Sequence, residues 1–131
     1  MRDIQALRQT ALAARALAHA PFSHFLVGAA IEAEDGRIFG GCNVENSSYG
    51  LTMCAERTAI FRAVAEGAKR FTRIAVVADT EKLTPPCGAC RQVLWDLCGD
   101  MEVILFNLTD ETETIRLSDL LPRAFDATFL D

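Results

Sequence analysis

Three cysteines and one glutamate form the pattern in this sequence that is best suited to chemistry. Cys87 and Cys90 follow a Pro-Pro pair at a predicted helix start, where residues three apart share one side. Cys54 lies upstream and is followed two positions later by Glu56. Three thiolate ligands leave a tetrahedral zinc ion with one open position, which is the arrangement of catalytic zinc sites. The pattern therefore predicts a catalytic site with one Zn²⁺ per chain.

The predicted positions of the thiols also favour zinc on electrostatic grounds. Cys54 and Cys87 each lie at the start of a predicted helix, and the partial positive charge there lowers the pKa of a thiol. Soft thiolates suit zinc better than magnesium or calcium. Three thiolates give the site a net negative charge, so a neighbouring cation is needed. Arg57 and Arg91 are candidates, and Arg57 is favoured because its N–H groups can donate to a thiolate sulfur.

Glu56 distinguishes an enzyme from a non-catalytic protein that is held together by zinc. A carboxylate beside an activated water can accept its proton and later deliver that proton to a substrate. A structural zinc would instead need a fourth protein ligand, from Cys42 or Cys98. Cys98 lies roughly 12 Å from Cys90 by helix rise, which is too far. Cys42 ends a predicted strand, so it leaves the structural alternative open.

The elements that must hold these groups alternate between helices and strands. Periodicity and turn residues predict helices over 3–18 (with Asp3 as N-cap), about 53–66, about 88–97 and 118–121, and strands over 26–31, 37–42, 74–78, 102–106 and near Ile115. Turns are expected at Asp35-Gly36 and around Asp110. Small residues in the first two strands predict that another backbone or a ligand packs closely there. This order predicts an α/β fold with a mixed sheet covered on both faces.

Composition limits the classes of partner. The 131 residues fit one domain spanning 1–131. The net charge is −5 and no run of basic residues occurs, which opposes nucleic acid as a partner. No apolar stretch has the roughly 20 residues of a membrane span, and the N-terminus lacks a signal-peptide pattern. We expect a cytoplasmic protein, whose five cysteines stay reduced. Because half of the residues are hydrophobic, we also expect an oligomer.

The motifs Cys54-Ala55-Glu56 and Pro86-Cys87-Gly88-Ala89-Cys90 resemble those of the zinc-dependent nucleoside and nucleobase deaminases. Residues 22–30, 43–51 and 120–125 extend the likeness to the short, homotetrameric cytidine deaminases. The resemblance implies hydrolytic deamination of cytidine and deoxycytidine to uridine and deoxyuridine, with release of ammonia, in pyrimidine salvage. It also implies a three-layer αβα sandwich with a mixed sheet of about five strands, and a homotetramer with composite active sites.

The resemblance also assigns roles to single residues. They are Cys54, Cys87 and Cys90 as zinc ligands, Glu56 as proton shuttle, Arg57 as a donor to the ligands, Phe25 against the pyrimidine, Asn43 and Glu45 at the ribose, and Tyr49 and Phe125 at a neighbouring subunit's site. The backbone N–H of Ala55, at a helix start, can hold the pyrimidine carbonyl. A zinc-activated water is then expected to attack C4 of cytosine, while Glu56 carries its proton to N3 and to the leaving amine.

Several alternatives stay open at this point. Taken alone, Phe25 fits a core position, and Asn43 with Glu45 fits a polar turn. Phe22 stands where the family usually has tyrosine, and His24 occupies a variable position. A zinc deaminase of another base or nucleoside analogue is one rival, although the Asn43 and Glu45 pair opposes a free base and the acidic charge opposes a polynucleotide. A non-catalytic, zinc-stapled interaction module is the other.

Overall fold

The computed structural model describes residues 4–109 and 111–130. Its elements, in chain order, are α1 (Gln5–Arg15), β1 (Val27–Ala33), β2 (Ile38–Cys42), the 3₁₀ helix η1 (Tyr49–Leu51), α2 (Ala55–Ala65), β3 (Phe71–Ala78), α3 (Gly88–Cys98), β4 (Glu102–Phe106), β5 (Thr112–Arg116), α4 (Leu117–Leu120) and the 3₁₀ helix η2 (Ala127–Phe129). Within the described ranges, no helix has the length and apolar character needed to cross a membrane.

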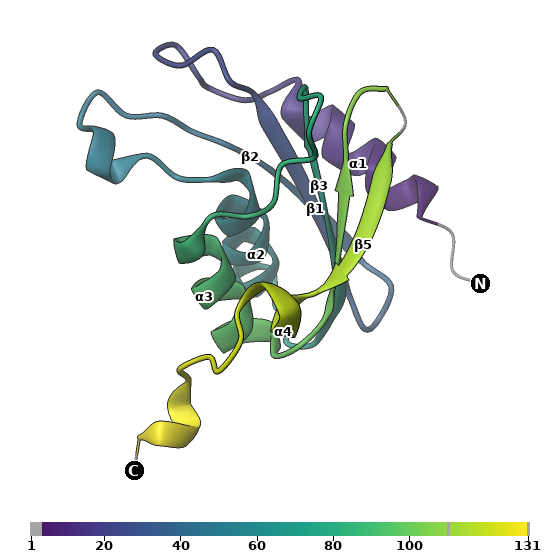
Figure 1. Ribbon diagram of the computed structural model, residues 1–131, viewed down its shortest axis with the longest axis vertical. Helices are drawn as coiled ribbons and strands as arrows, with labels where there is room; N and C mark the ends of the chain where they lie inside the picture. Colours follow the sequence, from purple (N-terminus) through teal and green to yellow (C-terminus); the bar gives the residue numbers. More distant parts are fainter. Residues whose placement is uncertain (1–3, 110, 131) are drawn as a thin grey trace.

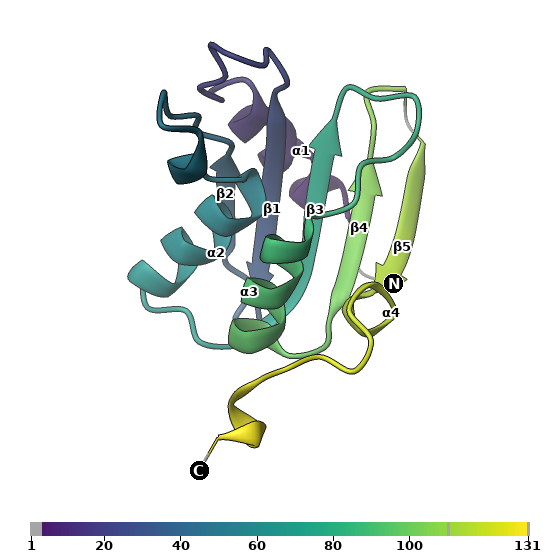
Figure 2. The same ribbon diagram turned by 60° about the vertical axis from the view of Figure 1, so that its left-hand side comes forward.

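A single mixed sheet forms the middle layer, with strand order β2-β1-β3-β4-β5. The β3–β4 pair is parallel, and the other pairs are antiparallel. Helix α1 covers one face of the sheet, and α2 and α3 lie side by side over the other (Figures 1 and 2). Each face has its own apolar core cluster. The expected three-layer αβα sandwich with five strands is confirmed.

Most predicted elements are confirmed, with shifted ends. The hairpin turn at Asp35-Gly36 is present, and Gly36 adopts a φ of +94° that suits glycine. The first helix ends at Arg15 rather than at residue 18, because the chain tightens into turns in which Leu17 and Ala18 donate to carbonyls three residues back. The expectations for Asp3 and Asp110 fall outside the described residues. The short 3₁₀ helices η1 and η2 were not predicted from the sequence.

Two glycines in the hairpin let helices lie directly on the strands. A Cβ atom at Gly28 would lie 2.0 Å from the carbonyl oxygen of Ala11 in α1. A Cβ atom at Gly41 would lie 2.4 Å from the backbone nitrogen of Ala59 in α2. Real Cβ atoms do not approach backbone atoms so closely, so both contacts require glycine. The prediction that another backbone packs on these strands is confirmed, and the Gly41 contact fixes the helix that follows Cys54.

Replacing Gly41 with alanine is expected to lower the free energy of unfolding by about 2 kcal/mol, because the added methyl group forces α2 away from β2. Gly50→Ala is the matched control, since a Cβ atom there meets no atom within 4 Å. Thermal and urea unfolding of the two variants provide the measurement. Equal stabilities for Gly41→Ala and Gly50→Ala would contradict the close packing of α2 on β2.

Candidate metal centre and active site

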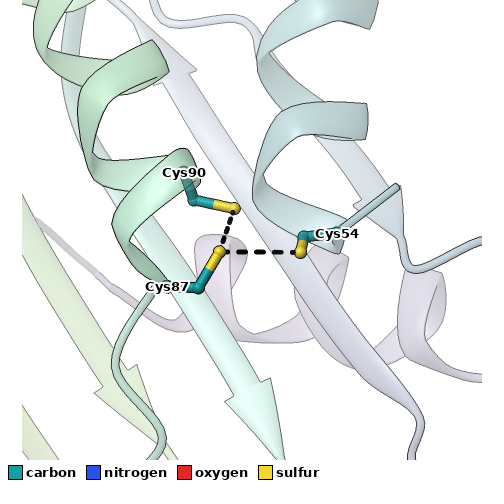
Figure 3. Close-up of side chains that lie close together, drawn as sticks. All are labelled: Cys54, Cys87 and Cys90. Atoms are coloured by element: carbon teal, nitrogen blue, oxygen red, sulfur yellow. Dashed lines mark hydrogen bonds between the residues drawn. The ribbon is translucent and has the colours of Figure 1, made fainter. Parts of the chain in front are cut away.

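Three thiols from two helices meet at the same end of the sheet. Cys54 is the N-cap of α2 and Cys87 is the N-cap of α3, while Cys90 lies in the first turn of α3. The Cys54 and Cys87 sulfur atoms are 3.8 Å apart, and the Cys87 and Cys90 sulfur atoms are 3.5 Å apart (Figure 3). All three sulfur atoms lie within 4.8 Å of one another. Tetrahedral coordination with zinc–sulfur distances of about 2.3 Å separates sulfur atoms by about 3.8 Å, so the three thiols fit a zinc ion.

The cluster does not include either of the other cysteines. Among the described residues, the group that could hold a metal consists of Cys54, Cys87 and Cys90 alone. Cys42, at the end of β2, lines a different hollow with residues of α1 and α2. Cys98 lies at the far end of α3, where burial raises the pKa of its thiol to about 12. The fourth protein ligand that a structural zinc requires is therefore not found in the described part of the chain.

The thiols differ in their electrostatic environment. Hydrogen bonding with the Cys90 thiol is the largest of the causes that lower the pKa of Cys54 to about 5. The same interaction raises the pKa of Cys90 above its ordinary value. A guanidinium N–H of Arg57 (Nη2) also donates to Cys54 Sγ over 3.4 Å. These contacts favour the thiolate form of Cys54, which is the form that binds zinc.

The two candidate arginines have different partners. Arg57 faces the thiols, and its Nε atom is buried with no hydrogen-bond partner among the described residues. Arg91 instead donates to the carbonyl oxygens of Pro86 at 2.7 Å and Leu120 at 2.8 Å. It thus ties the segment before Cys87 to the end of α4. Of these two cations, Arg57 is the one placed to offset thiolate charge.

Glu56 is buried beside the cluster, in the first turn of α2. Only 5% of its surface is exposed, and this burial is the main reason that its pKa rises from 4.5 to about 7. The residue lines a pocket of about 190 Å³ together with Cys54, Cys87 and Ala55. A carboxyl group with a pKa near neutrality can both accept and return a proton at physiological pH. The pocket therefore combines a candidate metal site with a candidate acid–base group.

Asn43 and Phe25 form another wall of the same pocket. The Asn43 side chain is buried, accepts from Val27 N at 2.9 Å and donates to the carbonyl oxygen of Phe25 at 2.7 Å. The Phe25 side chain is 41% exposed, so the core position that the residue type alone suggested is not what the structure shows. Asn43 therefore fixes the backbone that carries the Phe25 ring.

Glu45 lies in an adjoining hollow, whose lining includes Phe22, Ser23 and Tyr49. Its carboxylate accepts from Phe22 N at 2.9 Å, from Ser23 N at 3.2 Å and from the Ser23 hydroxyl. The Ser23 hydroxyl is the largest of the causes that hold the pKa of Glu45 below its ordinary value. The structure thus places Asn43 in the metal pocket and Glu45 beside it, with Thr52 lining both hollows.

Tyr49 and Phe125 lie outside the metal pocket of their own chain. Tyr49 is 74% exposed and packs edge-on against Phe22, with ring centroids 5.8 Å apart. Phe125 is 56% exposed and stacks on Phe129 at 5.6 Å, in a C-terminal segment that leads away from the sheet (Figures 1 and 2). Gln92 of α3 donates to the carbonyl oxygen of Phe125 at 2.8 Å. This segment is therefore anchored to the helix that carries two of the thiols.

Several pocket residues have no role that the sequence alone assigns. Val27, Thr52, Thr84 and Pro85 line the pocket with Glu56. Pro85 belongs to the motif before Cys87, so its position next to the site could have been inferred from that motif. Thr52 and Thr84 gave no signal, because a single threonine in a loop is common and its spatial neighbours come from distant segments.

The three-layer αβα domain carries three thiols at two adjacent helix starts and a buried carboxyl group beside them. These features define the class of zinc proteins that are equipped for acid–base catalysis. Residues 1–106 match the family described as the cytidine and deoxycytidylate deaminase zinc-binding region, and this chain belongs to that family. The zinc-binding region and the three-thiol cluster together fit one zinc ion per chain. The family resemblance seen in the sequence is confirmed.

Individual relatives agree with this assignment. Cytidine deaminase of Halalkalibacterium halodurans is 52% identical over 126 residues, which cover 95% of this chain and 96% of the relative. Cytidine deaminase of Mycobacterium tuberculosis is 43% identical over 94% of this chain and 90% of its own. The crystal structure of cytidine deaminase from Burkholderia pseudomallei is 50% identical, covers 95% of this chain and 100% of its own, and superposes with a TM-score of 0.90. The fold expectation is thereby also confirmed.

Proposed function

We propose that this chain catalyses the hydrolytic deamination of cytidine and deoxycytidine to uridine and deoxyuridine, with release of ammonia. Relatives that are 52% and 50% identical over most of the chain are named cytidine deaminases. The observation that carries the proposal is the position of Glu56, buried in the pocket wall beside three converging thiols. A purely structural metal site has no use for a buried carboxyl group with a raised pKa.

In this proposal the zinc ion is held by Cys54, Cys87 and Cys90. When bound, the ion would act as a Lewis acid that lowers the pKa of a water molecule to near neutrality. Glu56 takes the proton of the attacking water as a bond forms from its oxygen to C4 of cytosine. The same carboxyl group delivers this proton to ring nitrogen N3 and then takes the remaining proton of the hydroxyl group now bonded to C4. It passes this second proton to the amino group, so that the C4–N bond breaks, the C4 oxygen becomes a carbonyl and the amino group leaves as ammonia. Its pKa of about 7 suits both directions of transfer.

The other pocket residues bind and orient the nucleoside. The Phe25 ring packs against the pyrimidine, and the backbone N–H of Ala55, the first residue of α2, donates to the pyrimidine carbonyl. Asn43 and Glu45 are assigned to the ribose. Support for this assignment comes from their position, since Asn43 lines the metal pocket, Glu45 lies in the hollow beside it, and both hold the loop that carries Phe25.

The proposal also covers the oligomeric state, the location in the cell and the metabolic role. Residues 1–131 form one domain, which assembles as a homotetramer in the cytoplasm and serves pyrimidine salvage. Tyr49 and Phe125 complete composite active sites by reaching a neighbouring subunit. Their exposed side chains, outside the pocket of their own chain, support this arrangement.

A comparison of substrates tests the activity. The loss of absorbance near the cytidine band is followed with cytidine, deoxycytidine, cytosine and a short oligonucleotide. The proposal expects turnover of the two nucleosides only. Turnover of cytosine or the oligonucleotide would favour a deaminase with another substrate. No turnover of any of them, together with unfolding by a chelator, would favour the zinc-stapled module.

Replacing Arg57 with glutamine is expected to retain zinc and to lower kcat for cytidine about tenfold, because the thiolates lose a donor that offsets their charge. Arg62→Gln is the control on the same helix, since Arg62 pairs with Glu66 on the surface at 3.0 Å. Zinc content and kcat are measured for both variants. Equal kcat values for the parent and Arg57→Gln would remove Arg57 from the site.

A further inference from the structure

The hydroxyl group of Ser23 links the Glu45 side chain to the backbone of Phe25, two residues that the proposed function assigns to the substrate. It donates to the Oε2 atom of Glu45 and accepts from the backbone N–H of Phe25 at 3.0 Å. We infer that Ser23 is a positioning residue, which aligns Glu45 and Phe25 so that the sugar and the base of one nucleoside are bound together. This inference rests on the proposed function and assigns to Ser23 a role that no sequence motif indicated.

The Glu45 carboxylate is oriented almost entirely by the loop that contains Ser23. A carboxylate offers about four acceptor sites. The backbone N–H groups of Phe22 and Ser23 occupy two on Oε1, and the Ser23 hydroxyl occupies one on Oε2. Few lone pairs of the Glu45 carboxylate are left, so the hydrogen bonds from the loop determine which of its oxygen atoms can still accept from a sugar hydroxyl. The backbone of Glu45 is held separately, by donation from its N–H to the carbonyl oxygen of His19 at 2.8 Å.

Phe25 is held on both sides of its backbone by side chains. The Ser23 hydroxyl accepts from its N–H, and Asn43 Nδ2 donates to its carbonyl oxygen at 2.7 Å. Between Ser23 and Phe25, His24 adopts a φ of 58°, a left-handed conformation that non-glycine residues rarely adopt. Residues 20–26 belong to no helix or strand. A backbone hydrogen bond from His24 N–H to the carbonyl oxygen of Ala20 at 3.0 Å also holds this loop. The remaining hydrogen bonds come from side chains, with Ser23 and Glu45 on the exposed side and Asn43 on the partly buried side.

Removing the Ser23 hydroxyl should loosen both substrate contacts without disturbing the metal. No hydrogen bond of Ser23 reaches α2 or α3 among the described residues, so the thiols and Glu56 keep their positions. Asn43 still fixes the carbonyl side of Phe25 and the start of β1. The loss should thus appear in substrate binding and not in the chemical step.

Ser23→Ala is expected to raise KM for cytidine about tenfold, from the loss of a charge-assisted and a neutral hydrogen bond, while kcat and zinc content stay near the parent values. Ser23→Thr keeps the hydroxyl and should restore most of the affinity. Ser118→Ala is the matched control, because Ser118 also donates through its N–H and its hydroxyl to one carboxylate, that of Asp100, at 2.9 and 3.1 Å. Neither Ser118 nor Asp100 lines the metal pocket or the hollow at Glu45, so the KM of Ser118→Ala for cytidine should be unchanged.

A double-mutant cycle distinguishes action through Glu45 from a general effect. In a Glu45→Ala background, Ser23→Ala should raise KM by much less than in the parent. A nucleoside without sugar hydroxyls at 2′ and 3′, 2′,3′-dideoxycytidine, should likewise show a smaller effect of Ser23→Ala than cytidine does. An unchanged KM in Ser23→Ala, or a fall in kcat and melting temperature without a rise in KM, would overturn the inference. If the parent itself does not deaminate cytidine, the proposed function fails instead.

Discussion

Replacing Glu56 with glutamine is expected to lower kcat for cytidine by about a thousandfold or more, within the range that general acid–base groups contribute. Glutamine has nearly the same shape and fits the same buried position, where 5% of the surface is exposed. It cannot accept a proton from water or return one to the ring. Because Glu56 is not a member of the thiol cluster, the variant should still bind one zinc per chain.

The control for this variant is Glu66→Gln, at the other end of the same helix. Glu66 is the C-cap residue of α2 and pairs with Arg62 on the surface, so its loss should leave kcat near the parent value. Steady-state kinetics and metal analysis are carried out on the same preparations. A zinc-loaded Glu56→Gln variant that turns over cytidine at nearly the parent rate would show that another group moves the proton.

Replacing Cys90 with serine is expected to reduce the zinc content from about one per chain to nearly zero and to abolish turnover. Cys90 is fully buried between its partners, and serine is a poor ligand for zinc because its hydroxyl is harder and much less acidic than a thiol. Loss of the ion should also lower the melting temperature, since metal binding adds to the free energy of unfolding.

Cys98→Ser provides the matched control on the same helix. Cys98 is the last residue of α3 and packs against the core beneath it, outside the metal cluster. Its replacement should leave zinc content and kcat unchanged, with a small effect on stability at most. The zinc content of the two variants is compared by metal analysis after extensive desalting. A full complement of zinc in Cys90→Ser, or its loss in Cys98→Ser, would mean that the ligand set is different.

The local parts of the site could be predicted from the sequence because short-range patterns determine them. Cys87 and Cys90 are three residues apart at a helix start, so their common direction follows from helix geometry. Cys54 and Glu56 are likewise placed by one helix. The strands around Gly28 and Gly41 were predicted to have another backbone or a ligand packed closely on them, because both strands are rich in small residues.

The parts of the site that depend on distant segments could not be predicted in this way. Asn43 and Glu45 were expected at the ribose from the family resemblance, but nothing in their spacing indicates that both hold the loop at 22–25. Ser23 lies in a segment that resembles the family, but nothing in the sequence indicates that its hydroxyl contacts Glu45 and Phe25, since a serine in a loop has many surface roles. The strand order was equally beyond local patterns, because it depends on which residues pair across the whole sheet. Such contacts arise only when the chain is folded.

In the proposed reaction, the oxygen of water is added to C4 of cytidine and the amino group is expelled. The most direct test is to supply cytidine to the zinc-loaded protein in water enriched in oxygen-18 and to analyse the products by mass spectrometry. Hydrolysis at C4 predicts uridine that carries a single oxygen-18 atom, with an equal amount of ammonia. Unchanged cytidine, or uridine without the label, would contradict it.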